Sequence, residues 1–217
     1  MNTIWHIFWT WAIFRKKKYA IKPILFAFIP DIPWLFGLIF SIIINGISHE
    51  SFEQGFYYIP IIYATFFFHS FLIVTLFFII AKIKQKKKYF PYFYGWYFHI
   101  FLDYGTHVSD AYPIFWPISD FFIPSVISYW ERSHYSFEFA IFNLILASVF
   151  VTFLLYNKKE KFARMDIAFL TGLVIMIAVN FIFFFLIRPN TSYLIINAIP
   201  LILSLVLLVK IIKSRKK

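Results

Sequence analysis

The chain of 217 residues contains no cysteine and few charged residues. The absence of cysteine excludes disulfides and thiolate ligands, and leaves imidazole and carboxylate groups as the side chains available for binding a metal ion. Charged residues make up 14% of the chain, against 61% hydrophobic and 24% aromatic residues. A soluble domain of this length carries far more charge, so the composition predicts an all-α, polytopic helical membrane protein.

Acidic residues are scarce, since there are ten of them against 21 basic residues, and the net charge is +11. A charge of this sign can indicate nucleic-acid binding, but here the basic residues are clustered between apolar runs. Clusters beside membrane spans follow the positive-inside rule, so we interpret them as a topology signal and expect no nucleic-acid partner. The clusters lie at residues 15–22, 82–88, 158–164 and 210–217.

Apolar runs of about 20 residues are long enough to cross a membrane as helices. About six transmembrane helices are predicted, at residues 20–45, 57–81, 89–108, 137–156, 166–187 and 193–212. The basic clusters place residues 82–88, residues 157–165 and the C-terminus in the cytoplasm, whereas the loops 46–56 and 109–136 face outward. We therefore expect an integral protein of the cytoplasmic (inner) membrane of a prokaryote.

The first apolar stretch, Ile4 to Phe14, is too short to span the membrane. Its basic residues follow the apolar stretch, the reverse of the order in a signal peptide, so we expect a short interfacial or re-entrant helix. The whole chain, 1–217, is expected to form one membrane domain. Within it, residues 1–136 are the core that carries the polar residues, and residues 137–217 add three transmembrane helices.

Five ionisable residues lie in segments that otherwise look membrane-buried: His6, Asp31, His69, His99 and Asp103. An ionised group in hydrocarbon costs about 3 kcal/mol or more, so such residues normally face a bundle interior and have a partner. Counted from the nearest basic cluster at about 1.5 Å per helical residue, all five lie roughly 14 to 23 Å into the membrane. The shared depth predicts one metal-binding layer.

His99, Asp103 and His107 are spaced four residues apart, which places their side chains on one face of a helix. A carboxylate between two imidazoles can share a metal ion or orient one of the rings. Simpler interpretations stay open for single residues. A lone buried histidine usually satisfies a neighbouring helix, and Asp31 can cap the helix that begins near Pro33.

The order of these residues resembles that of the YdjM-like family of membrane-bound, metal-dependent hydrolases. The similar elements are His6, Pro30-Asp31-Ile32, His69-Ser70, Gly95 to Asp103, Trp116-Pro117 and Ser128 to His134. The chain departs from the family at Pro33, which replaces a second acidic residue, and at Ala64 to Phe68, which replace an Arg-Gly-x-Thr element. The ligand order is also similar, more distantly, to that of zinc-dependent phospholipase C.

The resemblance implies a hydrolase in which a metal-activated water attacks a phospholipid or another lipid-linked (phospho)ester. The metal ligands would be His6, Asp31, His69, His99 and Asp103, and the catalytic residues would be Asp31, His107, Glu131 and His134. Arg132 would hold the substrate phosphate through its planar guanidinium group, unless it forms a surface salt bridge with Glu131. Zinc is the first expectation for the ion, with manganese or iron as alternatives.

Two other functions are compatible with the same residues. An ion- or proton-coupled transporter would use the buried histidines and aspartates as a relay. Transporters often show repeat symmetry, however, and the last two predicted spans contain no histidine and no acidic residue beyond Asp166. A structural membrane protein would need the polar residues only for stability. The sequence predicts no oligomeric state.

Overall fold

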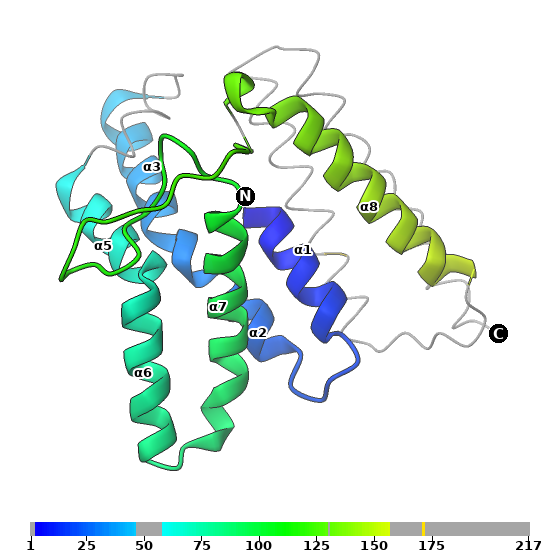
Figure 1. The fold of residues 1–217 in the computed structure, drawn as a ribbon, viewed down its shortest axis with the longest axis horizontal. Helices are drawn as coiled ribbons and strands as arrows, with labels where there is room; N and C mark the ends of the chain where they lie inside the picture. Colours follow the sequence, from blue (N-terminus) through cyan, green and yellow to red (C-terminus); the bar gives the residue numbers. More distant parts are fainter. Residues whose placement is uncertain (1–2, 47–57, 130, 157–170, 172–217) are drawn as a thin grey trace. The chain divides into compact units, whose positions relative to one another are not determined.

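The computed structural model describes residues 3–46, 58–129, 131–156 and 171 (Figure 1). These residues form helices and connecting loops and no strand, which confirms an all-α protein for the part of the chain described. The chain divides into two compact units, Met1–Ser136 and Phe137–Lys217. The predicted spans 166–187 and 193–212 fall outside the described residues.

Two helical segments are long and apolar enough to cross a membrane, Ile21–Asn45 and Ser136–Leu154. A third candidate is the pair Ile59–His69 and Phe71–Ile83, which is bent by 55° and is either one broken span or a re-entrant loop. These segments coincide with three of the predicted spans. They indicate a membrane protein with two or three candidate spans among the described residues.

The first unit contains most of the described helices. In chain order these are α1 (Thr3–Phe14), α2 (Ile21–Phe26), the 3-10 helix η1 (Ile29–Asp31), α3 (Ile32–Asn45), α5 (Ile59–His69), α6 (Phe71–Ile83), η2 (Lys87–Tyr89), α7 (Phe90–Tyr104) and η3 (Arg132–His134). Helix α8 (Ser136–Tyr156) begins at the end of this unit and continues into the second.

Helix α7 packs against α1, α2 and α6, and it carries the core side chains Phe93, Trp96 and Ile100. Gly95 lies directly against α2, and a β-carbon at this position would overlap the carbonyl group of Pro23. Only glycine therefore allows α2 to approach α7 so closely. This approach matters for the site, since Ala27 at the end of α2 contacts a histidine of α7.

The bend between α5 and α6 lies at Ser70, which interrupts the single straight span predicted for residues 57–81. The Ser70 hydroxyl accepts a hydrogen bond from the Ile73 amide and so caps α6, and it donates one to the Trp116 carbonyl oxygen. The indole of Trp96 donates to the Phe68 carbonyl oxygen at the end of α5. Side chains thus satisfy the backbone groups that the break frees, as hydrocarbon surroundings require.

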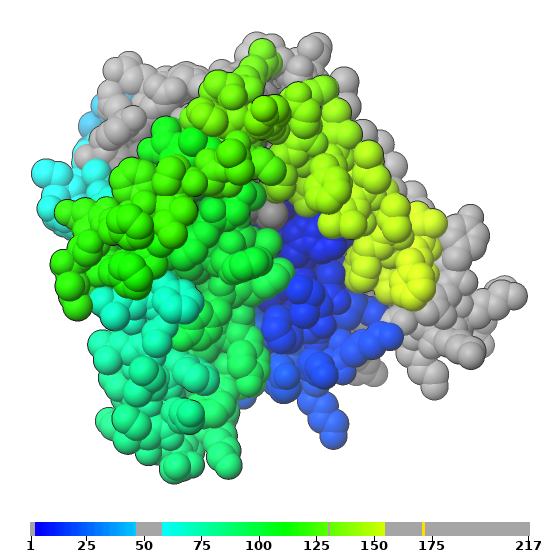
Figure 2. Space-filling model, viewed as in Figure 1, coloured from blue at the N-terminus to red at the C-terminus, as the bar shows by residue number. Residues whose placement is uncertain are grey.

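Helix α7 ends at Tyr104, so the prediction of a helix over 89–108 is wrong after that residue, and His107 lies beyond the helix. The physical reason is competition for backbone carbonyl groups. Ser125 bonds to the carbonyl oxygens of Gly105 and His107, and the Tyr129 amide bonds to that of Thr106. The loop that follows α7 therefore takes the acceptors that further helical turns would use, and its atoms cover this end of the unit (Figure 2).

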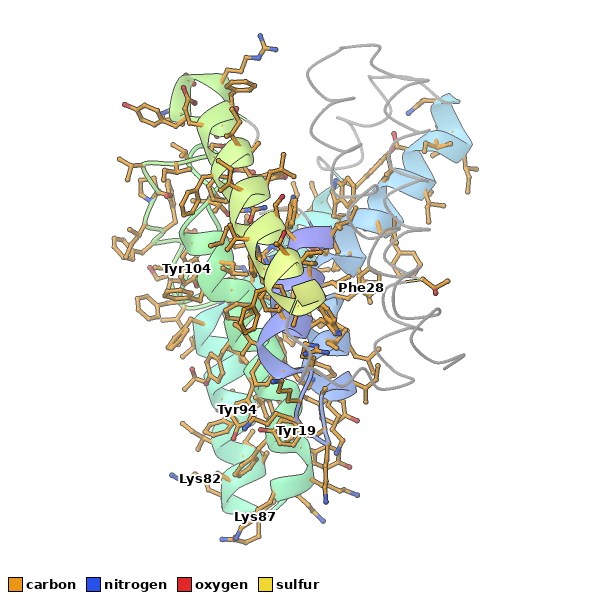
Figure 3. The ribbon with its side chains drawn as sticks, turned by 90° about the vertical axis from the view of Figure 1, so that its right-hand side faces the viewer. Tyr19, Phe28, Lys82, Lys87, Tyr94 and Tyr104 are labelled. Atoms are coloured by element: carbon orange, nitrogen blue, oxygen red, sulfur yellow. The ribbon has the colours of Figure 1, made fainter. Side chains whose placement is uncertain are left out.

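Lys82 in the last turn of α6 and Lys87 in the connection to α7 lie at one end of the helix pair, and Tyr104 lies far from them along α7 (Figure 3). The irregular loop after α7 begins near Tyr104, so the basic turn and the loop mark opposite ends of the helix pair. Helix α1 forms over the predicted stretch 4–14. Its buried side chains include His6, Thr10 and Trp11, and it packs against α2 and α7.

Candidate metal centre

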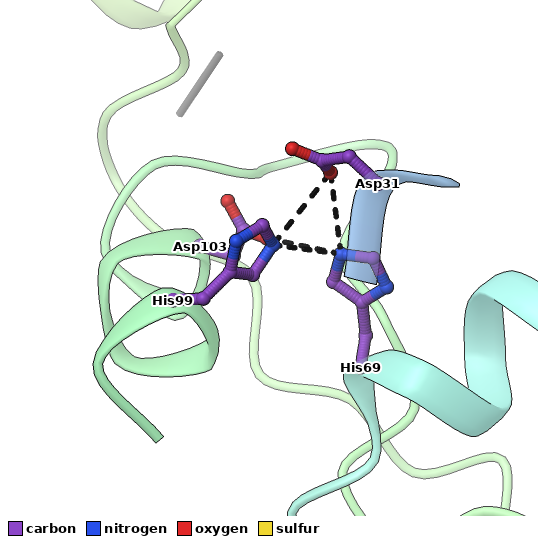
Figure 4. A group of neighbouring side chains, drawn as sticks. All are labelled: Asp31, His69, His99 and Asp103. Atoms are coloured by element: carbon purple, nitrogen blue, oxygen red, sulfur yellow. Dashed lines mark hydrogen bonds and ion pairs between the residues drawn. The ribbon is translucent and has the colours of Figure 1, made fainter. Parts of the chain in front are cut away.

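Four of the predicted ligands meet inside the first unit: Asp31, His69, His99 and Asp103 (Figure 4). One possible ligand atom from each residue lies within 4.8 Å of the corresponding atoms of the other three. Asp31 ends η1, His69 ends α5, and His99 and Asp103 occupy successive turns of α7. Three segments that are distant in sequence thus deliver four polar groups to one point, as the shared depth predicts.

The atoms that face one another at this point are all potential metal ligands. The Nε2 atoms of His69 and His99 lie 3.1 Å apart, and Asp103 Oδ2 lies 3.2 Å from the first and 3.0 Å from the second. Asp31 Oδ1 lies 3.7 Å from His69 Nε2 and 3.6 Å from His99 Nε2. His69, His99 and Asp103 are fully buried, whereas the Asp31 side chain is 16% exposed.

The opposite nitrogen of each imidazole is held by the backbone. His69 Nδ1 donates to the Thr65 carbonyl oxygen at 2.8 Å, and His99 Nδ1 donates to that of Ala27 at 2.8 Å. A neutral ring that donates from Nδ1 presents a lone pair at Nε2, and a second hydrogen bond of this kind orients the histidines of metal sites. Two Nε2 lone pairs therefore face each other beside two carboxylates, and a cation between them would satisfy all four groups.

Asp31 occupies the N-terminal capping position of α3, but its side chain makes no capping hydrogen bond. The capping interpretation of this residue is therefore not what the structure shows. Asp31 Oδ1 points to the two imidazoles, while Oδ2 is buried with no hydrogen-bond partner among the described residues. A buried carboxylate oxygen without a partner is costly, so this atom also suits a site that binds a cation or a water molecule.

His6 lies on the other side of Asp103 and outside the group of four. Its Nε2 atom is 2.8 Å from Asp103 Oδ1, the carboxylate oxygen that points away from His69 and His99. The His6 ring is fully buried and stacks on the His99 ring, with centroids 3.8 Å apart. The structure thus brings all five predicted metal ligands together, with His6 on a separate carboxylate oxygen.

His107 reaches the same oxygen from the turn after α7, with Nε2 at 3.1 Å from Asp103 Oδ1. Its Nδ1 donates to Asp110 Oδ2 at 2.8 Å. Burial raises the pKa of the Asp110 carboxyl, but the hydrogen bond from His107 and the charge of that ring outweigh burial, so the pKa lies below its ordinary value. Asp110 was not a predicted site residue, although its spacing of three from His107 is a signal for such a pair.

Tyr112 is a second residue at the centre that was not predicted. Its ring stacks on the His69 imidazole at a centroid distance of 4.0 Å, and the His107 ring lies at 5.0 Å. Burial and the neighbouring Asp103 carboxylate raise the pKa of the Tyr112 phenol well above its ordinary value, so the hydroxyl stays protonated. No spacing rule connects a loop tyrosine with a distant histidine earlier in the chain, and only the fold reveals this contact.

Glu131, Arg132 and His134 are not brought into contact with the group of four. Glu131 Oε2 lies 3.3 Å from His134 Nδ1, and Glu131 Oε1 accepts hydrogen bonds from the amide and hydroxyl of Ser109. Arg132 is exposed, and the ion pairs of the described residues do not include the predicted surface pair of Arg132 with Glu131. The Glu131 contact instead ties η3 to the loop that carries His107 and Asp110.

The chemistry of the donor set fits a divalent cation. Two neutral imidazoles and two carboxylates give a neutral site with such an ion, which reduces the cost of placing the ion in a low-dielectric interior.

Comparison of the chain with protein-family models, with curated proteins and with solved structures finds no match. The function therefore has to be inferred from the geometry of the centre and from the residues around it.

Proposed function

We propose that the chain is a membrane-embedded, metal-dependent hydrolase that acts on a phospholipid or another lipid-linked (phospho)ester. The observation that supports this most directly is the approach of His69 Nε2 and His99 Nε2 to within 3.1 Å of each other beside Asp31 and Asp103. The resemblance to the YdjM-like family, through the same residues, supports hydrolysis as the reaction. Zinc is the first candidate for the ion, with manganese or iron as alternatives.

When bound, a divalent ion can lower the pKa of a water molecule to about 7 and so supply a nucleophile at neutral pH. The residues of the chain have separate tasks around it. His69, His99 and Asp103 are buried and held by neighbouring groups, so they would fix the position of the ion. Asp31 has a buried oxygen, Oδ2, without a hydrogen-bond partner among the described residues, and this oxygen would accept the proton of the attacking water.

The membrane arrangement that accompanies this proposal has six transmembrane helices in the cytoplasmic membrane of a prokaryote, with the C-terminus in the cytoplasm. The basic turn between α6 and α7 would lie on the cytoplasmic side, and the loop after α7 on the outer side. Asp103 and His107 lie near the loop end of α7, which is consistent with a centre that opens toward the outer boundary. A lipid-linked substrate could place its head group there while its chains remain in hydrocarbon.

The first experiment measures metal in the full-length protein purified in detergent. We expect near-stoichiometric metal in the wild type and its loss in His69→Ala and Asp103→Ala. His134→Ala and Asp120→Asn are matched controls, because both side chains are outside the centre, and they should keep the metal. Unchanged metal content in the first two variants would refute the metal centre.

Hydrolysis requires its own experiment. The wild type, loaded with zinc or manganese in mixed micelles, is incubated with phospholipids of different head groups, and the released head group is measured. Turnover that depends on both the metal and Asp31 is the expected result. Turnover that is equal in the wild type and in Asp31→Asn would contradict the assigned role of this carboxylate.

An ion- or proton-coupled transporter is the alternative that the helix break at Ser70 favours, because interrupted helices line the binding sites of many transporters. The two functions differ in what the reconstituted protein does. A transporter would carry an ion flux across vesicles in response to a gradient and would need no bound transition metal. Such a flux, abolished by Asp103→Ala in protein that contains no metal, would replace the hydrolase proposal.

A further inference from the structure

The carboxylate of Asp103 lies between two pairs of imidazoles, one pair on each oxygen. Oδ2 lies 3.2 Å from His69 Nε2 and 3.0 Å from His99 Nε2. Oδ1 lies 2.8 Å from His6 Nε2 and 3.1 Å from His107 Nε2. The group of four with Asp31 accounts for only the first of these pairs. A second set of nitrogen and oxygen atoms therefore gathers at the other oxygen of the same carboxylate.

The hydrogen bond between His107 and the Asp110 carboxylate is of a type that recurs around metal-bound histidines. His107 Nδ1 donates to the Asp110 carboxylate at 2.8 Å, which leaves Nε2 as the nitrogen directed at Asp103. A histidine that binds a metal commonly donates its other nitrogen to a carboxylate in this way, which fixes the tautomer and makes the ring a better ligand. His6 is fully buried, and its stacking on the His99 ring holds it beside the first set of ligands.

We infer that the centre binds two divalent ions bridged by the Asp103 carboxylate, the second held by His6, His107 and Asp103 Oδ1 and supported by Asp110. The inference rests on the proposed function, because it extends the same metal centre. Sites with two ions about 3.5 to 4 Å apart are a known solution for phosphoester chemistry, since one ion can act on the attacking oxygen and the other on the leaving oxygen. A carboxylate that bridges through its two oxygens suits such a separation.

The pair of ions favours one class of substrate. Two divalent ions carry four positive charges, and the carboxylates of Asp31, Asp103 and Asp110 supply three negative ones. The one positive charge that remains can be neutralised by the hydroxide formed from the bound water, so the resting centre needs no further charge. Because one ion can act on the attacking oxygen and the other on the leaving oxygen, the pair favours a phosphoester over a carboxylic ester.

The test counts ions per chain in full-length protein that is stripped with chelator, reloaded with excess Mn²⁺ or Zn²⁺, and freed of unbound metal. The wild type should bind two ions. His107→Ala and His6→Ala should each bind one, and His134→Ala should bind two as the matched control. One ion in the wild type, or two ions in both His107→Ala and His6→Ala, would overturn the inference.

A second measurement distinguishes the loss of the second ion from misfolding of the variant. Two Mn²⁺ ions joined by one carboxylate are magnetically coupled, so the electron paramagnetic resonance spectrum of the wild type should differ from that of an isolated ion. His107→Ala and the milder His107→Gln should show the spectrum of an isolated ion, which also demonstrates that the first set of ligands is still assembled. A spectrum of isolated ions in the fully loaded wild type counts against a bridged pair.

The outcomes for the two proposals can be told apart. Two bound ions without turnover of any phospholipid or phosphate ester would support the paired centre and contradict the hydrolase. Turnover with one bound ion would support the hydrolase and overturn the paired centre. Faster turnover of a neutral ester than of a phosphoester with the same chains would contradict the substrate class inferred from the pair of ions.

Discussion

The Nε2 atoms of His69 and His99 lie 3.1 Å apart, although each ring donates from Nδ1 to a backbone carbonyl oxygen. If both rings are neutral, no proton is available to join these two nitrogens, and their lone pairs repel. The arrangement is stable when a cation lies between the rings or when one ring carries an additional proton. These two cases, a bound cation and an additional proton, are distinguished by measuring metal affinity in variants of the ligands and of the residues that hold them.

Replacement of Asp31 by asparagine should weaken metal binding while the fold is preserved. The asparagine side chain would keep the shape of the original but lose the charge that Oδ1 presents to the two imidazoles. A loss of at least about tenfold in affinity is expected, since even partners that only orient a ligand contribute about 10- to 100-fold. Competition with a coloured chelator measures the affinity, and Asp120→Asn, a position outside the centre, is the control.

Replacement of Gly95 by alanine should destabilise the first unit and disturb the centre at a distance. The added methyl group would meet the Pro23 carbonyl group and push α2 away from α7, which would move the Ala27 carbonyl oxygen from His99. Overpacking of this kind costs about 1 to 3 kcal/mol. Thermal unfolding in detergent and metal content are both measured. Gly105→Ala is the matched control, because its nearest neighbour would be at an ordinary contact distance of 3.5 Å.

Replacement of Asp110 by asparagine should lower the affinity for one of the two ions by about 10- to 100-fold. The low pKa of Asp110 means that its carboxylate is ionised throughout the neutral range and loses its charge only on strong acidification. The affinity should be compared at about pH 8, where protons compete least with the ion for the imidazoles. Equal affinities of the wild type and the variant at this pH would contradict the supporting role of Asp110.

The predicted topology can be tested by chemical labelling, because the chain has no native cysteine. Lys87→Cys, in the turn between α6 and α7, should react with a membrane-impermeant maleimide only after the membrane is disrupted. Val126→Cys, at a position that is 78% exposed in the loop after α7, should react in intact cells or spheroplasts. Equal labelling of both positions in intact membranes would reject the orientation inferred from the basic clusters.

Much of the centre is predictable from the sequence, because a charged group in an apolar segment needs a partner wherever it occurs. Five residues are identified by this reasoning without knowledge of the tertiary fold: His6, Asp31, His69, His99 and Asp103. The contributions of His6 and His107 are less predictable, since the division between the two Asp103 oxygens depends on how α1 and the turn after α7 approach that residue. Such an approach leaves no regular spacing in the sequence.

The ends of the helices are likewise less predictable from the sequence than the presence of the helices. An apolar run predicts a helix over 57–81, but the bend at Ser70 depends on the Trp116 carbonyl group, which comes from a distant loop. The end of α7 at Tyr104 likewise depends on Ser125 and Tyr129, whose hydrogen bonds take the place of further helical turns. Local hydropathy predicts where helices occur, whereas tertiary hydrogen bonds decide where they stop.

The separation of the four candidate ligands along the chain would also link metal binding to folding. The four candidate ligands come together only in the folded protein, because they lie at positions 31, 69, 99 and 103. An ion that binds all of them therefore has little affinity for the unfolded chain. An ion present at about a thousand times its dissociation constant stabilises the folded state by about 4.1 kcal/mol. Scarcity of metal would then reduce the amount of protein that survives quality control in the membrane, before any effect on turnover rate.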